Sequence, residues 1–223
     1  FYLSLFWYRP RPLDFPIVQT DVVWWWADLG VFLWGVLVIL YGYLSFGTLA
    51  AFAISFTGWS WMILTARAGL SAVAPLLEDL QYLHLAARAS TLGNALRFPT
   101  VVAAAITFFI WNFLLLPIIY FKAIPPGKAR AKFIRFNFGF FMANVHMLNL
   151  PLALVNNVFG TGARLFDYSD LWVAYLIIML YSLLYLFVLD RLGLHFYPMF
   201  SPRSSICVFS FGAILGLYYH LMQ

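Results

Sequence analysis

Six stretches of about 20 apolar residues recur along this chain, and they constrain its fold more than any other feature. The hydrocarbon core of a bilayer is about 30 Å thick, and a helix needs about 20 apolar residues to cross it. The stretch from Phe98 to Phe121 contains no charged residue at all. The sequence therefore predicts an all-α integral membrane protein, multi-pass, with six transmembrane helices in one bundle, at about 22–44, 46–66, 98–121, 138–155, 171–189 and 204–220.

The scarcity of charge supports the same conclusion. Hydrophobic residues make up 64% of the chain and charged residues only 9%, with a mean hydropathy of +0.88. A soluble domain carries about 25% charged residues, so lipid must cover much of this surface. The net charge of +5 lies mostly in short loops between apolar stretches. These loops favour membrane lipids, with anionic headgroups, as partners and make nucleic acid an unsuitable one.

The segments outside the six stretches also carry structural signals. Residues 1–21 are aromatic and Pro-rich and are expected to form an interfacial N-terminal segment before a six-helix transmembrane domain over 22–223. Leucines at helical spacing predict an interfacial amphipathic helix from Leu70 to Arg88. Residues 41–45 include Gly42 and predict a tight turn between the first two spans, and the basic loop from Lys122 to Arg135 is predicted to be a turn. Six spans would place both termini on one side.

His146 is the residue most suggestive of chemistry. It lies near the middle of the fourth predicted span, about 12 Å from either end at about 1.5 Å per residue. An ionisable group at that depth is costly and faces the protein interior or a wet cavity. Asn149, three residues later, shares its helix face. A catalytic histidine and a structural knot of interhelical hydrogen bonds are equally compatible with this pattern, and both predict an inward side chain with a polar partner.

The other ionisable residues are interpreted as structural. Asp28 follows three tryptophans typical of an interface belt, so it is read as a snorkelling or hydrogen-bonded carboxylate near headgroup depth. His84, His195 and His220 lie in loops or near interfaces. The sequence has no Gly-rich phosphate loop and no Cys or His cluster with metal-ligand spacing, so no cofactor and no metal are expected.

Four ordered stretches resemble the androgen-induced-protein family, which includes the androgen-dependent regulator of tissue factor pathway inhibitor. The second predicted span reads FGTLAAFAISFTGWSWMILTA and is similar to a family span that opens with a Thr after an aromatic-rich turn. The third opens LRFPTVVAAAITFFIW, similar to a Phe-Pro entry followed by a Phe-Trp pair. The motif HMLNLP is similar to the family's His followed five residues later by Pro, and GLHFYP is similar to its Tyr-Pro landmark.

This resemblance implies a six-span membrane hydrolase with a Thr nucleophile and a His on separate helices. Carried over by position, it assigns Thr48 as the nucleophile and His146 as the catalytic His. It further implies hydrolysis of fatty-acid esters of hydroxy fatty acids, in the endoplasmic reticulum or plasma membrane. The ends of the predicted spans leave the two side chains at depths that differ by roughly 9 Å, so the assembly of this pair is the point that a structure has to test.

A different class of function is also compatible with the sequence. The chain could be a non-catalytic accessory subunit of a larger membrane complex, such as a respiratory-chain or ATP-synthase assembly of the mitochondrial inner membrane, with other subunits as its partners. The near absence of soluble segments, the start at Phe1 without a Met and the aromatic residues of 1–21 favour this alternative. A transporter or channel is disfavoured, because few charged residues lie within the predicted spans.

Overall fold

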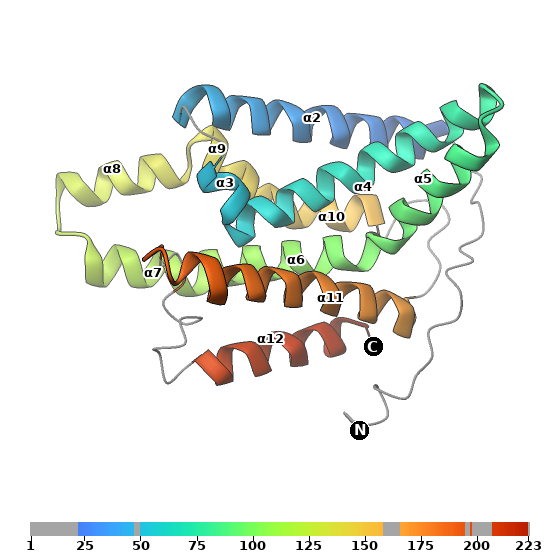
Figure 1. The fold of residues 1–223 in the computed structure, drawn as a ribbon. Coiled ribbons are helices and arrows are strands. Elements are labelled where there is room, and N and C mark those ends of the chain that lie inside the picture. The colour runs from blue at the N-terminus through green and yellow to red at the C-terminus, as the bar shows by residue number, and fades with distance from the viewer. Residues whose placement is uncertain (1–21, 47–49, 158–165, 195–196, 198–206, 223) are drawn as a thin grey trace.

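All regular structure in the described part of the protein is helical (Figure 1). The computed structural model describes residues 22–46, 50–157, 166–194, 197 and 207–222. The predicted interfacial segment 1–21 lies outside these residues. The all-α expectation is therefore confirmed for the described ranges, and the arrangement of the helices decides where polar side chains meet.

Four described helices are long and apolar enough to cross a membrane: Val22–Ser45, Phe56–Asp79, Leu83–Ala123 and Tyr168–Leu189. The pair Lys128–Asn137 and Phe140–Asn157 adds a fifth if it counts as one span bent by 56°. The last helix, α12 (Cys207–Met222), has 16 residues, fewer than the about 20 that a bilayer core requires. These apolar helices are compatible with an integral membrane protein, whereas six spans remain a prediction.

Small residues allow the first two long helices to approach closely. α2 (Val22–Phe46) packs against α4 (Phe56–Asp79). A Cβ atom at Gly35 would lie 2.2 Å from Thr65 Oγ1, and one at Gly69 would lie 2.7 Å from the Phe32 ring. Without a hydrophobic driving force between helices, membrane helices rely on such close packing. The two glycines therefore set the distance between α2 and α4.

α6 (Arg97–Phe109) is the central helix and contacts α4, α10, α11 and α12. Its buried face includes the small residues Ala103, Ala104 and Ala105, which let neighbouring helices come close. α6 continues into η1 (Ile110–Leu115), a π-helical stretch in which backbone hydrogen bonds skip one extra residue. The other elements are α3 (Ala50–Ile54), α5 (Leu83–Ala95), α7 (Leu116–Ile118), η2 (Ile119–Ala123), α8 (Lys128–Asn137), α9 (Phe140–Ala143), η3 (Asn144–Leu148), α10 (Asn149–Asn157), α11 (Tyr168–Leu184) and η4 (Tyr185–Leu189).

One predicted turn is helical, and the other is confirmed only over its first part. α2 continues through Gly42 to Phe46, so the turn predicted over 41–45 is wrong. Gly42 instead leaves room for a neighbouring ring, since a Cβ atom there would lie 2.5 Å from Phe141. The predicted basic turn contains α8 from Lys128 onward, which leaves only the short connection before it as a turn.

The predicted surface helix Leu70–Arg88 is also wrong. α4 extends through most of it to Asp79, and the chain reverses around Gln81, at φ 63°, before α5 begins. Ala72 in this part of α4 is buried, and its carbonyl accepts a hydrogen bond from the Trp25 indole at 2.9 Å. Most of the large apolar residues that predicted a surface helix are nevertheless exposed: Val73, Leu76, Leu80 and Leu83.

The second predicted span is divided rather than continuous. α3 ends at Ile54, and α4 begins at Phe56 with Ser55 as its N-cap, in extended conformation (φ −85°, ψ 146°). The Ser55 hydroxyl accepts a hydrogen bond from the amide of Gly58 at 3.0 Å. This break places a helix N-terminus inside a segment predicted to cross the membrane as one helix.

Candidate functional site

His146 lies inside the protein, as its position in an apolar span predicts. It belongs to the π-helical stretch η3, and its side chain is buried, with 6% of the residue exposed. Its Nε2 atom is 3.3 Å from the hydroxyl oxygen of Thr57. The prediction of an inward side chain with a polar partner is therefore confirmed. π-Helical stretches are rare and often occur at functional sites.

Thr57 is the hydroxyl that the fold brings to His146. It occupies the first turn of α4, directly after the break at Ser55. Close packing holds this turn, because a Cβ atom at Gly58 would lie only 1.8 Å from the carbonyl oxygen of Phe52 in α3. Thr57 and His146 are 89 residues apart in the chain. The pair thus depends on how α4 and η3 pack against each other.

The His146 ring is held in an orientation suited to a base. Its Nδ1 atom lies 3.3 Å from the carbonyl oxygen of Met142. A carbonyl oxygen can only accept, so this hydrogen bond places the proton on Nδ1 and leaves the lone pair of Nε2 toward Thr57. The Trp111 ring stacks on the imidazole with centroids 4.1 Å apart. The Asn112 amide donates to the His146 carbonyl at 2.9 Å.

Trp111 is itself fixed by a polar contact. Its indole nitrogen donates to the side-chain oxygen of Asn137 at 2.7 Å, and Asn137 is 1% exposed. Trp111 and Asn112 both come from the π-helical stretch η1, so this stretch meets the π-helical stretch of His146. A backbone carbonyl and an indole ring therefore orient the His146 imidazole. In many catalytic triads a carboxylate has this orienting role.

A cavity opens beside Thr57, and polar groups face it among apolar walls. We call it the Thr57 cavity; it is lined by Phe56, Thr57, Ile106, Thr107, Ile110, Trp111, Leu115 and Tyr197. Thr107 is 4% exposed, and among the described residues its hydroxyl has no hydrogen-bond partner. The lining of this cavity therefore includes one buried hydroxyl without a hydrogen-bond partner among the described residues.

Tyr197 completes the wall of the Thr57 cavity. The Tyr185 hydroxyl donates to the Tyr197 carbonyl at 2.9 Å and lies 3.2 Å from its amide. Phe56 and Thr57, in the first turn of α4, line the same cavity as Tyr197. Burial raises the pKa of Tyr197, so its hydroxyl stays protonated and can donate at neutral pH.

The family resemblance assigns Thr48 as the nucleophile. Thr48 lies outside the described residues, as does His195. Thr57 was not singled out by the sequence reasoning, although the order Ser55, Phe56, Thr57, Gly58 contains a signal for it. Ser is a preferred N-cap residue, and recognising a helix start at Ser55 would have put Thr57 at a helix N-terminus. His84 and His220 are exposed and take no part in the site.

A second polar cluster lies between α2, α4 and α10. Arg67 Nη1 donates to Asp28 Oδ1 at 2.7 Å and to Asn156 Oδ1 at 2.5 Å, and Asn156 also donates to Asp28. Each of the three residues is at most 7% exposed. Asp28 is hydrogen-bonded, as predicted, but it does not snorkel to the interface, because Arg67 pairs with it inside the protein. Arg67, which directly follows the second predicted span (46–66), lies within α4.

Asn149 and Asn144 connect the helical segment around His146 to neighbouring helices through side-chain hydrogen bonds. Asn149 is fully buried and donates to the Ser60 hydroxyl at 2.8 Å. Asn144 accepts from the indole nitrogen of Trp34 at 2.7 Å. Among the described residues, no group of three or more His, Cys, Asp or Glu side chains could hold a metal ion. The chemistry available at His146 is therefore that of a hydroxyl, an imidazole and a phenol.

Comparison with models of known protein families, with curated proteins and with solved structures gives no significant match. The resemblance to the androgen-induced-protein family consequently remains a prediction from the sequence.

Proposed function

We propose that this protein is an intramembrane hydrolase of lipid esters, with His146 as the general base and Thr57 as the nucleophile. The observation that carries the proposal is the 3.3 Å contact between Thr57 Oγ1 and His146 Nε2 inside apolar helices. A hydroxyl is a weak nucleophile until a base takes its proton, and a neutral His is the commonest such base. Catalytic contacts are often somewhat long before substrate binds.

The reaction proceeds in two balanced steps. His146 Nε2 takes the Thr57 proton while Oγ1 attacks the ester carbonyl, and the tetrahedral intermediate collapses to an acyl-threonine. The protonated imidazole gives its proton to the departing alkoxide, which leaves as an alcohol. A water molecule, deprotonated by His146, then attacks the acyl-threonine, releasing a carboxylic acid and restoring Thr57.

Tyr197 is the proposed donor to the oxygen that becomes negative. Tyr197 lines the same cavity as Thr57. An ester carbonyl attacked by Thr57 would lie in this cavity, beside the phenol. Prearranged donors of this kind contribute about 3 to 4 kcal/mol to transition-state stabilisation.

The surroundings of the pair favour a lipid substrate. Apart from Thr57, Thr107 and Tyr197, the lining of the Thr57 cavity is made of hydrocarbon, aromatic and indole side chains. A molecule that diffuses within the bilayer can reach such a site laterally, without exposing the pair to bulk water. The family resemblance specifies fatty-acid esters of hydroxy fatty acids as the substrate and the endoplasmic reticulum or plasma membrane as the location.

Labelling with a fluorophosphonate tests the proposal, because this probe reacts with activated hydroxyl nucleophiles. The purified wild type should be labelled and should hydrolyse a lipid ester, and Thr57→Ala and His146→Ala should each lose both activities. Since the two groups act as a unit, the double variant should be no worse than either single variant. Thr48→Ala is the matched control, because it removes the hydroxyl that the family resemblance assigns.

The outcomes separate the competing assignments. Loss of labelling in Thr48→Ala with retention in Thr57→Ala would make Thr48 the nucleophile. No labelling and no hydrolysis by the folded wild type would overturn the hydrolase proposal. The alternative would then be a non-catalytic subunit of a membrane complex, and it would require co-purification with stoichiometric partner subunits.

A further inference from the structure

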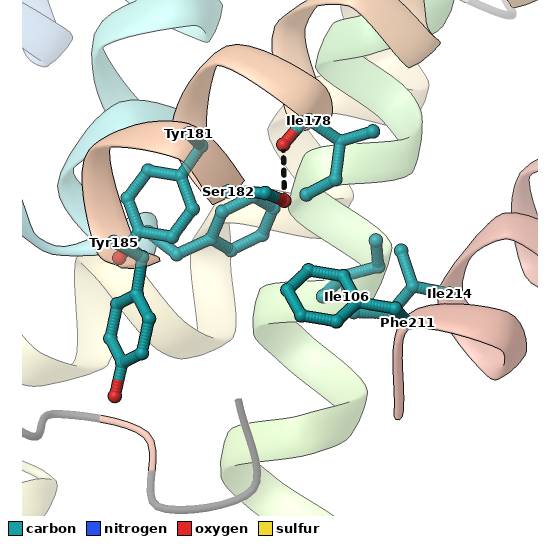
Figure 2. Close-up of a pocket in the computed structure, with 8 residues that line it drawn as sticks. Ile106, Ile178, Tyr181, Ser182, Tyr185, Phe211 and Ile214 are labelled. Carbon is teal, nitrogen blue, oxygen red and sulfur yellow. Dashed lines mark hydrogen bonds between the residues drawn. The ribbon is translucent and has the colours of Figure 1, made fainter. Parts of the chain in front are cut away.

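We propose that a second, apolar pocket between α6, α11 and α12 holds the acyl chain of the ester whose carbonyl reacts at Thr57. This inference rests on the proposed function and specifies its substrate. The pocket, which we call the acyl pocket, is shown in Figure 2, with Ile106 of α6, Ile178 and Ser182 of α11, and Phe211 and Ile214 of α12 among its lining residues.

The acyl pocket adjoins the Thr57 cavity. Phe56 and Ile106 line both spaces, so the two spaces are neighbours. Phe56 also directly precedes Thr57 in the first turn of α4. For an ester whose carbonyl carbon lies at Thr57 Oγ1, the acyl pocket is therefore the adjoining apolar space for the attached chain.

The wall of the acyl pocket presents no free polar group. Three lining residues carry hydroxyls, and each hydroxyl donates to a backbone carbonyl. Ser182 donates to Ile178 at 2.6 Å, as the dashed line in Figure 2 shows. Tyr181 donates to Ile54 at 3.2 Å and Tyr185 donates to Tyr197 at 2.9 Å. The Tyr185 hydroxyl accordingly points away from Phe211 and Ile214 in Figure 2.

This lining selects the class of ligand. A headgroup, sugar or phosphate placed there would lose its hydrogen bonds to water and gain none, which is costly. An alkyl chain loses nothing of that kind, and the lining side chains have to move apart to admit one, because the space measures about 20 Å³. The Thr57 cavity differs in having two threonines and a tyrosine in its lining. The two adjoining spaces thus match an ester group joined to a hydrocarbon chain.

Ile214 is the side chain best suited to test the acyl pocket. It is 6% exposed and faces the pocket from α12, so Ile214→Trp would fill the space with a larger ring. Val208 on the same helix is 80% exposed, so Val208→Trp adds the same bulk on the outer surface and serves as the matched control. Melting temperature and monodispersity in detergent establish that both variants are folded.

Photo-crosslinking measures occupancy without requiring catalysis. A long-chain fatty acid with a diazirine near its methyl end is added to the full-length protein in nanodiscs, and crosslinked residues are mapped by mass spectrometry. We expect crosslinks on the acyl pocket residues of α11 and α12 in both the wild type and Thr57→Ala, displaced by excess unlabelled fatty acid. Ile214→Trp should reduce these crosslinks at least tenfold, and Val208→Trp should leave them unchanged.

A substrate series supplies the second measurement. Among esters of increasing acyl length, Ile214→Trp should retain hydrolysis of the shortest and lose at least tenfold on the longest. Crosslinks confined to outward-facing residues, or equal in Ile214→Trp and the wild type, would overturn the acyl pocket even if hydrolysis is observed. Crosslinks in the acyl pocket without any hydrolysis would instead overturn the proposed function and leave the acyl pocket standing.

Discussion

Gly58→Ala should inactivate the site without touching either reacting side chain. A Cβ atom at this position would lie 1.8 Å from the Phe52 carbonyl oxygen, whereas ordinary contacts begin at 3.4 Å. The Cβ atom would therefore be 1.6 Å too close. Because Cβ is fixed to the α4 backbone and its neighbour is a backbone oxygen, α3 or the first turn of α4 has to move. Thr57 is the residue before Gly58, and its contact with His146 is already 3.3 Å long.

The size of the effect follows from that displacement. A misplacement of about 1 Å in a catalytic group costs about a hundredfold in rate. We therefore expect fluorophosphonate labelling of Gly58→Ala to be at least a hundredfold slower than that of the wild type. Some stability will also be lost, so labelling rates are compared well below the melting temperature of each variant.

A glycine in open space provides the control. Gly30 lies in α2, and a Cβ atom there meets nothing within 4 Å. Gly30→Ala should therefore label at the wild-type rate, with slightly higher stability from the better helix propensity of Ala. A folded Gly58→Ala that labels as fast as Gly30→Ala would refute the reasoning that the break at Ser55 positions Thr57.

Three further predictions concern the surroundings of the site. Tyr197→Phe should lower kcat by about a hundredfold or more with little change in KM, because the phenol is proposed to act on the transition state; an unchanged kcat would remove Tyr197 from the mechanism. Arg67→Met should destabilise the protein by about 3 to 5 kcal/mol, because it leaves the Asp28 carboxylate buried without its partner. The double variant Arg67→Met with Asp28→Leu should recover most of that stability in detergent-unfolding titrations. Equal stability of Arg67→Met and the wild type would show that the ion pair is not buried. Trp111→Leu should slow labelling by removing the ring stacked on His146, whereas Trp111→Phe should retain most of the rate; equal rates for Leu and Phe at this position would count against an orienting role for the ring.

The sequence alone was sufficient for the class of fold and for one member of the site. Runs of about 20 apolar residues predict helices locally, because each run must satisfy its own backbone in lipid. The same reasoning predicts that His146 turns inward, since an ionisable group is costly against acyl chains. Neither inference needs to know which helices are neighbours, and the structure agrees with both.

Hydropathy did not locate the ends of the helices well. α4 continues beyond the predicted span end at 66 as far as Asp79, and α2 passes through Gly42. In each case a contact with another helix decides the matter, as Ala72 does with Trp25 and Gly42 does with Phe141. Hydropathy averaged along the sequence does not register contacts between residues of different helices.

The partners of the polar residues were decided by tertiary structure. Thr57 meets His146 across 89 residues, and Asp28 meets Arg67 across 39. Each meeting depends on the rotation and relative depth of two helices. Those quantities are set by close approaches such as Gly35 against Thr65 and by the break at Ser55. The sequence determined that this protein is helical and largely apolar, with polar residues at a few interior points. Only packing decided which of those points touch, because a contact between helices is a property of both surfaces together.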